Sequence, residues 1–184
     1  MFKKSLTILA VVAVVFAAFV AMQPSQFSVT RSIKINAAPA VIFAHINNQQ
    51  KWHDWSPWTK LDPKMVQVFE GPDEGVGSIA RWSGDRMVGK GSSEIVESKP
   101  DEYVKFQLKF EEPMKSEHVS EFSLVKEGND TLVTWTMTGE KNFAAKAMGL
   151  FCNCDEKVGG MFEEGLANLK MVAQKAGEGK AAKK

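Results

Sequence analysis

The sequence has few of the residues that build metal centres and disulfide frameworks. Its 184 residues include only two cysteines and three histidines. Two cysteines cannot form a disulfide framework, and three histidines leave few ligands for a metal cluster, so we expect no metal site. The sequence also lacks an excess of one charge, since 23 Lys and Arg oppose 22 Asp and Glu. This balance argues against a nucleic-acid-binding protein, which needs a concentrated basic surface.

Signatures of nucleotide cofactors and of common hydrolases are missing as well. We find no P-loop, no GxSxG or HExxH motif and no dinucleotide-binding fingerprint. The glycine-rich segment 71–77 joins two predicted strands and opens no helix, so it is not expected to hold a phosphate group. The sequence therefore predicts no cofactor.

The residues that are present suffice for one folded domain between two distinct ends. Hydrophobic residues make up 44% and charged residues 24% of the chain, which are ordinary proportions for a globular protein. We place the domain at residues 27–175. Residues 1–26 form an apolar segment and a polar linker, and residues 176–184 form a basic tail that we expect to be disordered.

The apolar segment predicts a membrane anchor. Lys3 and Lys4 precede a run from Leu6 to Met22 that is broken only by Thr7. About 17 to 18 helical residues span some 26 Å, close to the hydrocarbon thickness of about 30 Å. We therefore expect residues 5–22 to cross a membrane once, with the N-terminus inside and the domain on the periplasmic or extracytoplasmic side. The alternative is a secretory signal peptide that is cleaved from a secreted domain.

The domain itself reads as one strand, two short helical segments, six strands and a long helix. A helix begins near Pro39, and residues 49–52 form a further turn. The segments with alternating apolar and polar residues are 27–35, 65–70, 77–83, 90–98, 103–110, 118–125 and 131–138. Such closely spaced strands predict an antiparallel meander with one buried face.

The last element is a helix with an apolar stripe and unusual glycines. Asp155 is a plausible N-cap. Gly159, Gly160 and Gly165 lie inside this helix, where each costs about 1 kcal/mol relative to alanine. Either the helix packs very close to the sheet, or the small residues leave room for a ligand. The apolar stripe consists of Val158, Phe162, Leu166, Leu169, Val172 and Ala173.

We therefore predict an α+β domain in which a curved, seven-stranded antiparallel sheet wraps around the long C-terminal helix, preceded by one transmembrane helix. One helix covers only part of so large an apolar face. The remaining space is filled by aromatic side chains or left as a cavity.

Five segments of the sequence carry a resemblance to a known family. They read FSVTRSIKINAAPAVIFAHI, WHDWSPW, FEGPDEGVGSIARW, DTLVTWTMTGE and GMFEEGLANLKMVAQ. Residues 27 to about 174 resemble the START-like superfamily, also labelled SRPBCC or polyketide cyclase/dehydrase and lipid-transport proteins, with the helix-grip (Bet v 1-like) fold. An anchor ahead of such a domain resembles many bacterial members. The resemblance implies binding of a hydrophobic or amphipathic molecule between sheet and helix, and in a minority of members cyclisation or dehydration.

Several aromatic residues are candidates for lining that cavity, and all of them are equally candidates for a plain core. Trp52, Trp55 and Trp58 form the densest aromatic cluster, and Trp52 and Trp55 are spaced to share a helical face. The candidate cavity residues are Trp55, Trp58, Trp82, Phe106, Phe122, Trp135 and Phe162.

Two polar residues are weak catalytic candidates. His118 shares its side of a strand with Phe122 and Leu124, so it either faces the interior as a ligand-orienting group or general base, or contacts water at the strand end. Arg31 shares its side with Val29 and Ile33, and an inward guanidinium needs an acidic partner or a ligand carboxylate. A twist or bulge that turns Arg31 outward is the interpretation we favour.

The pair Cys152 and Cys154 stands just before the last helix. It is compatible with two ordinary thiols, a strained and easily reduced disulfide, or part of a metal site. The resemblance assigns no function to it.

The leading hypothesis is a membrane-anchored domain that binds a hydrophobic small molecule or lipid and sequesters or transfers it without chemistry. The alternatives are a cyclase/dehydrase-type enzyme acting in the same cavity, and a stress-related interaction domain with a packed interior.

Overall fold

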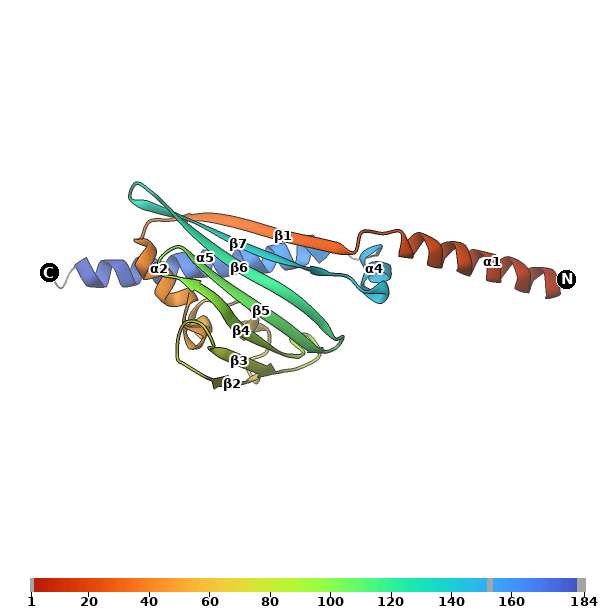
Figure 1. The fold of residues 1–184 in the computed structure, drawn as a ribbon, viewed down its shortest axis with the longest axis horizontal. Coiled ribbons are helices and arrows are strands. Elements are labelled where there is room, and N and C mark those ends of the chain that lie inside the picture. The colour runs from red at the N-terminus through yellow and green to blue at the C-terminus, as the bar shows by residue number, and fades with distance from the viewer. Residues whose placement is uncertain (1, 152–153, 182–184) are drawn as a thin grey trace.

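The computed structural model describes residues 2–151 and 154–181 as one sheet with helices against it and an N-terminal helix that extends away from it (Figure 1). The helical elements are α1 (Phe2–Ala21), α2 (Pro39–Ile46), the 3₁₀ helix η1 (Gln49–Asp54), α3 (Trp58–Leu61), α4 (Phe143–Gly149) and α5 (Cys154–Ala181). The strands are β1 (Gln26–Ile35), β2 (Val66–Glu70), β3 (Ile79–Ser83), β4 (Lys90–Lys99), β5 (Tyr103–Glu112), β6 (Ser116–Glu127) and β7 (Asp130–Glu140).

The seven strands form one antiparallel sheet, as the alternating pattern predicts, and their order is β1-β7-β6-β5-β4-β3-β2. Strands β2 to β7 follow one another as a meander, whereas β1 pairs with β7 from the far end of the sequence, with Arg31 opposite Trp135. This register runs without a bulge from the pair Gln26–Glu140 to the pair Ile35–Thr131. β1 and β2 are therefore the two edges of the sheet.

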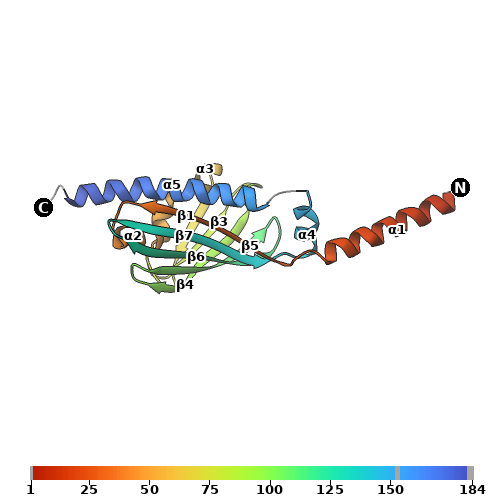
Figure 2. The same ribbon diagram turned by 90° about the horizontal axis from the view of Figure 1, so that it is seen from above.

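Helix α5 lies along one face of the sheet, which we call the inner face (Figure 2). The alternate residues of β1, β5, β6 and β7 point to this face, as the period of two requires. The buried core between the inner face, α2 and α5 includes Val29, Ile35, Ile42, Ile46, Ile95, Val104, Phe122, Val133, Leu166 and Leu169. Burial of this apolar surface is what holds the helix to the sheet.

The sequence analysis does not predict two of the helices, because both are short. α3 has four residues and α4 has seven, too few for a hydrophobic period to show. The start of α4 is fixed by Asn142, whose side chain accepts a hydrogen bond from the backbone N–H of Ala145. α5 extends to Ala181, into the stretch expected to be a tail. The predicted alternatives for Cys152 and Cys154 concern side chains outside the described residues.

The predicted membrane-crossing helix is not found. Within the part of α1 whose side chains the structure describes, residues 8–21, and within the other described helices, none is both long and apolar enough to span a bilayer. A crossing needs about 20 apolar residues, and this described part is shorter.

Candidate functional site

Seven aromatic rings pack against one another at the centre of the inner face. Trp135 stacks on Phe162 of α5 with ring centroids 4.0 Å apart and an angle of 3° between the planes. On its other side Trp135 stacks on Phe122 at 4.6 Å. We call the following set the central stack: Trp52, Trp55, Trp58, Phe106, Phe122, Trp135 and Phe162. Trp55, Phe106, Phe122, Trp135 and Phe162 are at most 2% exposed, so these rings fill the space between sheet and helix.

Three of the four indole N–H groups in the central stack have hydrogen-bond partners within the protein. The indole N–H of Trp135 donates to the hydroxyl of Ser120 at 2.8 Å. The indole N–H groups of Trp52 and Trp55 donate to the carbonyls of Ile46 and His45 in α2. These three indoles are thus held in one orientation, because a buried N–H without a partner would cost free energy.

A second set of rings crosses the inner face beyond the central stack and is only half-buried. Trp82 on β3, Phe110 on β5, His118 on β6 and Phe27 on β1 follow one another with centroids 5.6, 5.4 and 5.1 Å apart. We call these four residues the aromatic row. Half-buried Leu108 stands directly opposite His118 in the sheet. The row therefore offers an apolar, partly accessible surface that spans the sheet.

His118 is the one titratable group of the aromatic row. Its Nε2 lies 3.0 Å from the hydroxyl of Ser116. Its Nδ1 is buried without a hydrogen-bond partner among the described residues. Burial lowers the pKa of His118 below its ordinary value of 6.5, so the ring is neutral at pH 7. Nδ1 also lies against Gly139, where an added Cβ would be 2.0 Å from it, so of the two ring nitrogens Nε2 is the one left for a hydrogen bond with a ligand.

Arg31 faces the inner side of the sheet and not outward, because β1 pairs with β7 without a twist or bulge that would turn it away, and it meets a partner from the protein itself. Its Nε donates to the carboxylate of Glu163 on α5 at 2.7 Å, and its Nη1 donates to the carbonyl of Thr30. The guanidinium lies against Gly159 of α5, where an added Cβ would be 2.0 Å from Nη2. Arg31 thus joins β1 to α5.

The glycines of α5 allow close packing of the helix. A Cβ at Gly165 would lie 2.9 Å from the ring of Trp135 and 3.2 Å from Pro57. A Cβ at Gly160 would meet nothing within 4 Å among the described residues. Of the two alternatives raised by the sequence, close approach to the sheet accounts for Gly159 and Gly165.

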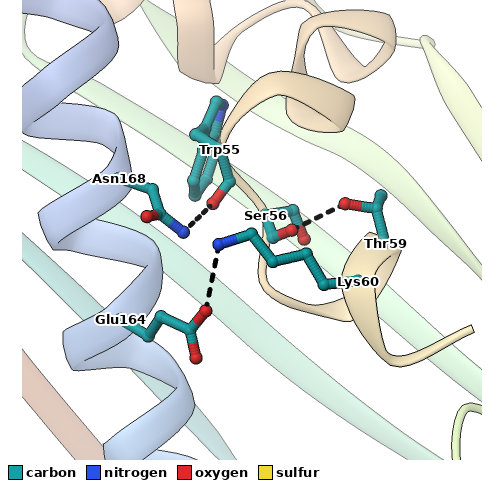
Figure 3. A network of polar contacts seen from close by, with 6 residues as sticks. All are labelled: Trp55, Ser56, Thr59, Lys60, Glu164 and Asn168. Carbon is teal, nitrogen blue, oxygen red and sulfur yellow. Dashed lines mark hydrogen bonds and ion pairs between the residues drawn. The ribbon is translucent and has the colours of Figure 1, made fainter.

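The segment that carries the tryptophans is tied to α5 by two polar contacts (Figure 3). The side-chain amide of Asn168 donates to the carbonyl of Trp55 at 3.1 Å, and both residues are buried. The ammonium of Lys60 pairs with Glu164 at 3.2 Å on the exposed side. The hydroxyl of Thr59 donates to the carbonyl of Ser56, which closes the turn into α3. These contacts hold η1 and α3 in place over the central stack.

A groove of about 1060 Å³ lies at the opposite end of the sheet from α4. It lies between the start of α2, the β4–β5 turn and the β6–β7 hairpin, and Glu97 and Lys99 in its wall form an ion pair at 3.1 Å. Its lining residues are Ala38, Pro39, Ala40, Glu97, Lys99, Asp101, Glu102, Tyr103, Ser123, Leu124, Val125 and Lys126. None of the sequence-predicted cavity residues lines it.

The structure thus divides the predicted cavity residues between two places. Trp55, Trp58, Phe106, Phe122, Trp135 and Phe162 lie in the central stack, whereas Trp82 lies in the aromatic row with the candidate His118. The sequence analysis missed Phe27 and Phe110 as site residues, although their alternation already placed them on the inner face. Among the described residues no group of three or more His, Cys, Asp or Glu could hold a metal ion.

Comparison with known proteins identifies the class to which this domain belongs. Residues 26–174 match the family model described as polyketide cyclase/dehydrase and lipid transport. The chain belongs to this family, as the resemblance in the sequence indicated. No curated protein sequence matches it.

Solved structures show the same fold at low sequence identity. The protein MLL2253 from Mesorhizobium loti is 12% identical, with a TM-score of 0.60 over 81% of this chain and 98% of that one. The major latex-like protein 151 from Panax ginseng is 13% identical, with a TM-score of 0.55 over 84% and 99%. DynU16, a protein of the dynemicin biosynthetic locus, is 11% identical, with a TM-score of 0.56 over 82% and 48%. These likenesses establish the helix-grip-like fold of a curved sheet with a C-terminal helix.

Proposed function

We propose that the protein binds a hydrophobic or amphipathic small molecule or lipid against the aromatic row, and that it sequesters or transfers this molecule without chemical change. The observation that carries the proposal is the half-burial of Phe27, Trp82, Phe110 and His118 on an inner face whose centre is fully packed. Half-buried apolar rings lose their remaining contact with water when an apolar molecule covers them. The family model, which includes lipid transport, supports the same class of ligand.

The polar features of the row fit an amphipathic ligand. The imidazole of His118 and the indole N–H of Trp82 are the hydrogen-bonding groups of the row, and Phe27 and Phe110 meet the imidazole edge to face. A ligand with an apolar body and one hydroxyl or carbonyl group would match this arrangement. Arg31 stands outside it, because its guanidinium already pairs with Glu163.

The alternative is a cyclase/dehydrase-type enzyme, and one observation favours it. His118 is held neutral by burial, and a neutral imidazole can act as a general base on a molecule bound at the row. In this alternative His118 is the catalytic residue, and H118Q would retain the ligand but lose its conversion. Under the leading proposal the bound molecule is recovered chemically unchanged from both proteins.

The test compares the molecules that co-purify with the full chain and with two lysine variants, each isolated from its native host and identified by mass spectrometry. In L108K the ammonium group would stand beside His118 on the inner face, where it repels an apolar ligand. Q107K, on the outer side of the same strand, is the matched control. We expect a molecule that accompanies the wild type and Q107K, and at least about tenfold less of it with L108K.

This comparison also distinguishes molecules that bind outside the aromatic row, because such molecules accompany the wild type and both variants. Circular dichroism and thermal melting establish that L108K is folded. If the folded wild type carries no molecule that L108K lacks, and binds no fluorescent fatty-acid analogue in a way that L108K abolishes, the proposal is wrong. The packed-interior interaction domain then becomes the better description.

We also propose, on the sequence alone, that residues 5–22 keep the domain at a membrane with the domain on the extracytoplasmic side. Support comes from the apolar run between Leu6 and Met22 and from Lys3 and Lys4 ahead of it. The measurement is fractionation of native cells followed by the mass of the intact protein. Loss of about the first 20 residues would instead establish a cleaved signal peptide.

A further inference from the structure

Strand β2 is an open edge of the sheet. It pairs with β3 on one side, and no strand of the described residues pairs with its other side. All five of its residues are exposed, and Val66 and Val68 are 62% and 51% exposed. Figure 1 shows β2 along the lower border of the molecule with no element beyond it. Alternate N–H and C=O groups of such an edge are directed outward and can pair with another strand.

The sequence of this edge is complementary to itself when it is read in the opposite direction. Residues 64–70 read KMVQVFE, and β2 itself is the part from Val66 to Glu70. Lys64 lies in the turn just before β2, where its backbone N–H donates to the carboxylate of Asp62, so in the pair described below Lys64 and Met65 would extend the strand. In an antiparallel pair of two such segments centred on Gln67, Lys64 stands opposite Glu70 of the second copy. Val66 then stands opposite Val68 of the second copy. Residues that stand opposite each other in a sheet project to the same face, so each pair is in contact.

We propose that β2 pairs with β2 of a second copy of this chain, antiparallel and with the two-fold axis at Gln67. The pair would join the two sheets into one continuous sheet, through an isologous contact of the kind that closes a dimer. This proposal is independent of the proposed function, since it concerns the edge of the sheet and not the inner face.

The charged and apolar residues of this edge favour a second copy of the chain as its partner and favour one register of the pairing. In the proposed register two Lys64–Glu70 contacts and two Val66–Val68 contacts lie on the outer face, while Met65 stands opposite Phe69 on the inner face. Shifting the pairing by one residue would leave Lys64 opposite Gly71 and Gln67 opposite Val68. Glu70 keeps its own contact with Arg81, whose Nε lies 2.9 Å from it, because a carboxylate accepts several hydrogen bonds.

The first test is the molar mass of the full chain in detergent, measured by light scattering coupled to size-exclusion chromatography. We expect a dimer for the wild type. In V68K two ammonium groups would face the apolar Val66 of the opposite copy, so we expect a monomer. The matched control is V125K, which should remain a dimer. Val125 is 54% exposed on the outer face of β6, a strand that has neighbours on both sides.

A charge-swap series tests the register. K64E places like charges opposite each other twice and should weaken the dimer by about tenfold or more, as should E70K. The double variant K64E/E70K restores opposite charges and should recover most of the wild-type dissociation constant. A double variant that dimerises no better than the singles would exclude this register.

Cross-linking locates the two-fold axis. With Cys152 and Cys154 replaced by serine, Q67C should form a disulfide between two copies, because residues directly opposite in an antiparallel pair have Cα atoms about 4.5–5.5 Å apart. V125C on the same background should not. A monomeric wild type, an oligomer that V68K leaves unchanged, or cross-linking of V125C as readily as Q67C would each overturn the proposal.

Discussion

At the scale of single residues, three glycines of α5 show how far the same substitution depends on its surroundings. Gly160 is exposed, Gly159 lies under the guanidinium of Arg31, and Gly165 lies under the ring of Trp135. Trp135 cannot retreat, since it is stacked between Phe122 and Phe162. The side chain of Arg31 is flexible, but an added Cβ would lie 2.0 Å from its Nη2, so the guanidinium would have to move by more than about 1 Å and strain its contact with Glu163.

The three alanine variants should therefore change the free energy of unfolding in different directions. G160A is expected to raise the free energy of unfolding by about 0.5–1 kcal/mol, because alanine favours the helix over glycine. G165A is expected to lower it by about 1–3 kcal/mol, because the added methyl group overlaps a fixed ring. G159A should lie between them. Urea denaturation measures all three, and a stabilising G165A would contradict the packing of α5 on Trp135.

His118 gives the second prediction at this scale. Burial lowers its pKa in the folded protein, so the unfolded chain binds more protons between that lowered value and 6.5. The free energy of unfolding should consequently fall as the pH is lowered through this range. H118Q should remove part of this fall, and another part should persist because burial also lowers the pKa of His45.

The measurement is urea denaturation between pH 7.5 and pH 5 for the wild type and H118Q. An H118Q protein whose stability declines as steeply as that of the wild type would show that the buried ring of His118 does not titrate in this range.

At the scale of elements, the two contacts between α5 and the tryptophan segment should contribute very differently. N168A leaves the buried carbonyl of Trp55 without its donor and should cost about 1–3 kcal/mol. K60A removes an ion pair whose side chains are 63% and 49% exposed and should cost less than about 1 kcal/mol. Thermal melting of both variants checks this order. The opposite order would mean that the exposed ion pair contributes more than the buried hydrogen bond to holding the tryptophan segment on α5.

Elements long enough to show a hydrophobic period could be predicted from the sequence, and shorter elements could not. Alternation placed β5, β6 and β7 and turned Phe122 and Trp135 inward. The glycines of α5 predicted that something unusual lay against the helix, but their neighbours come from β1, β7 and the α3 segment. α3 and α4 carry too few residues for a period, so their formation depends on local caps and tertiary contacts.

At the scale of the whole molecule, the sheet is completed by the pairing of β1 with β7, whose residues lie about a hundred positions apart. This pairing brings Phe27 to His118 and Arg31 to Glu163. It leaves β2 as the opposite edge, with its side chains exposed. The aromatic row and the proposed dimer contact both result from this strand order, so the ligand and dimer experiments test properties of the complete sheet.

The small number of cysteines and histidines and the balanced charge, with which the sequence was first described, excluded disulfide-framework and nucleic-acid-binding proteins. The sequence by itself also determined the strand and helix pattern, the inward side of each long strand and the family. Only the tertiary structure decided that six of the seven candidate cavity residues pack into one stack, and that Arg31 meets Glu163. The physical reason is that periodicity fixes the direction of a side chain, whereas its neighbour is set by the packing of distant segments.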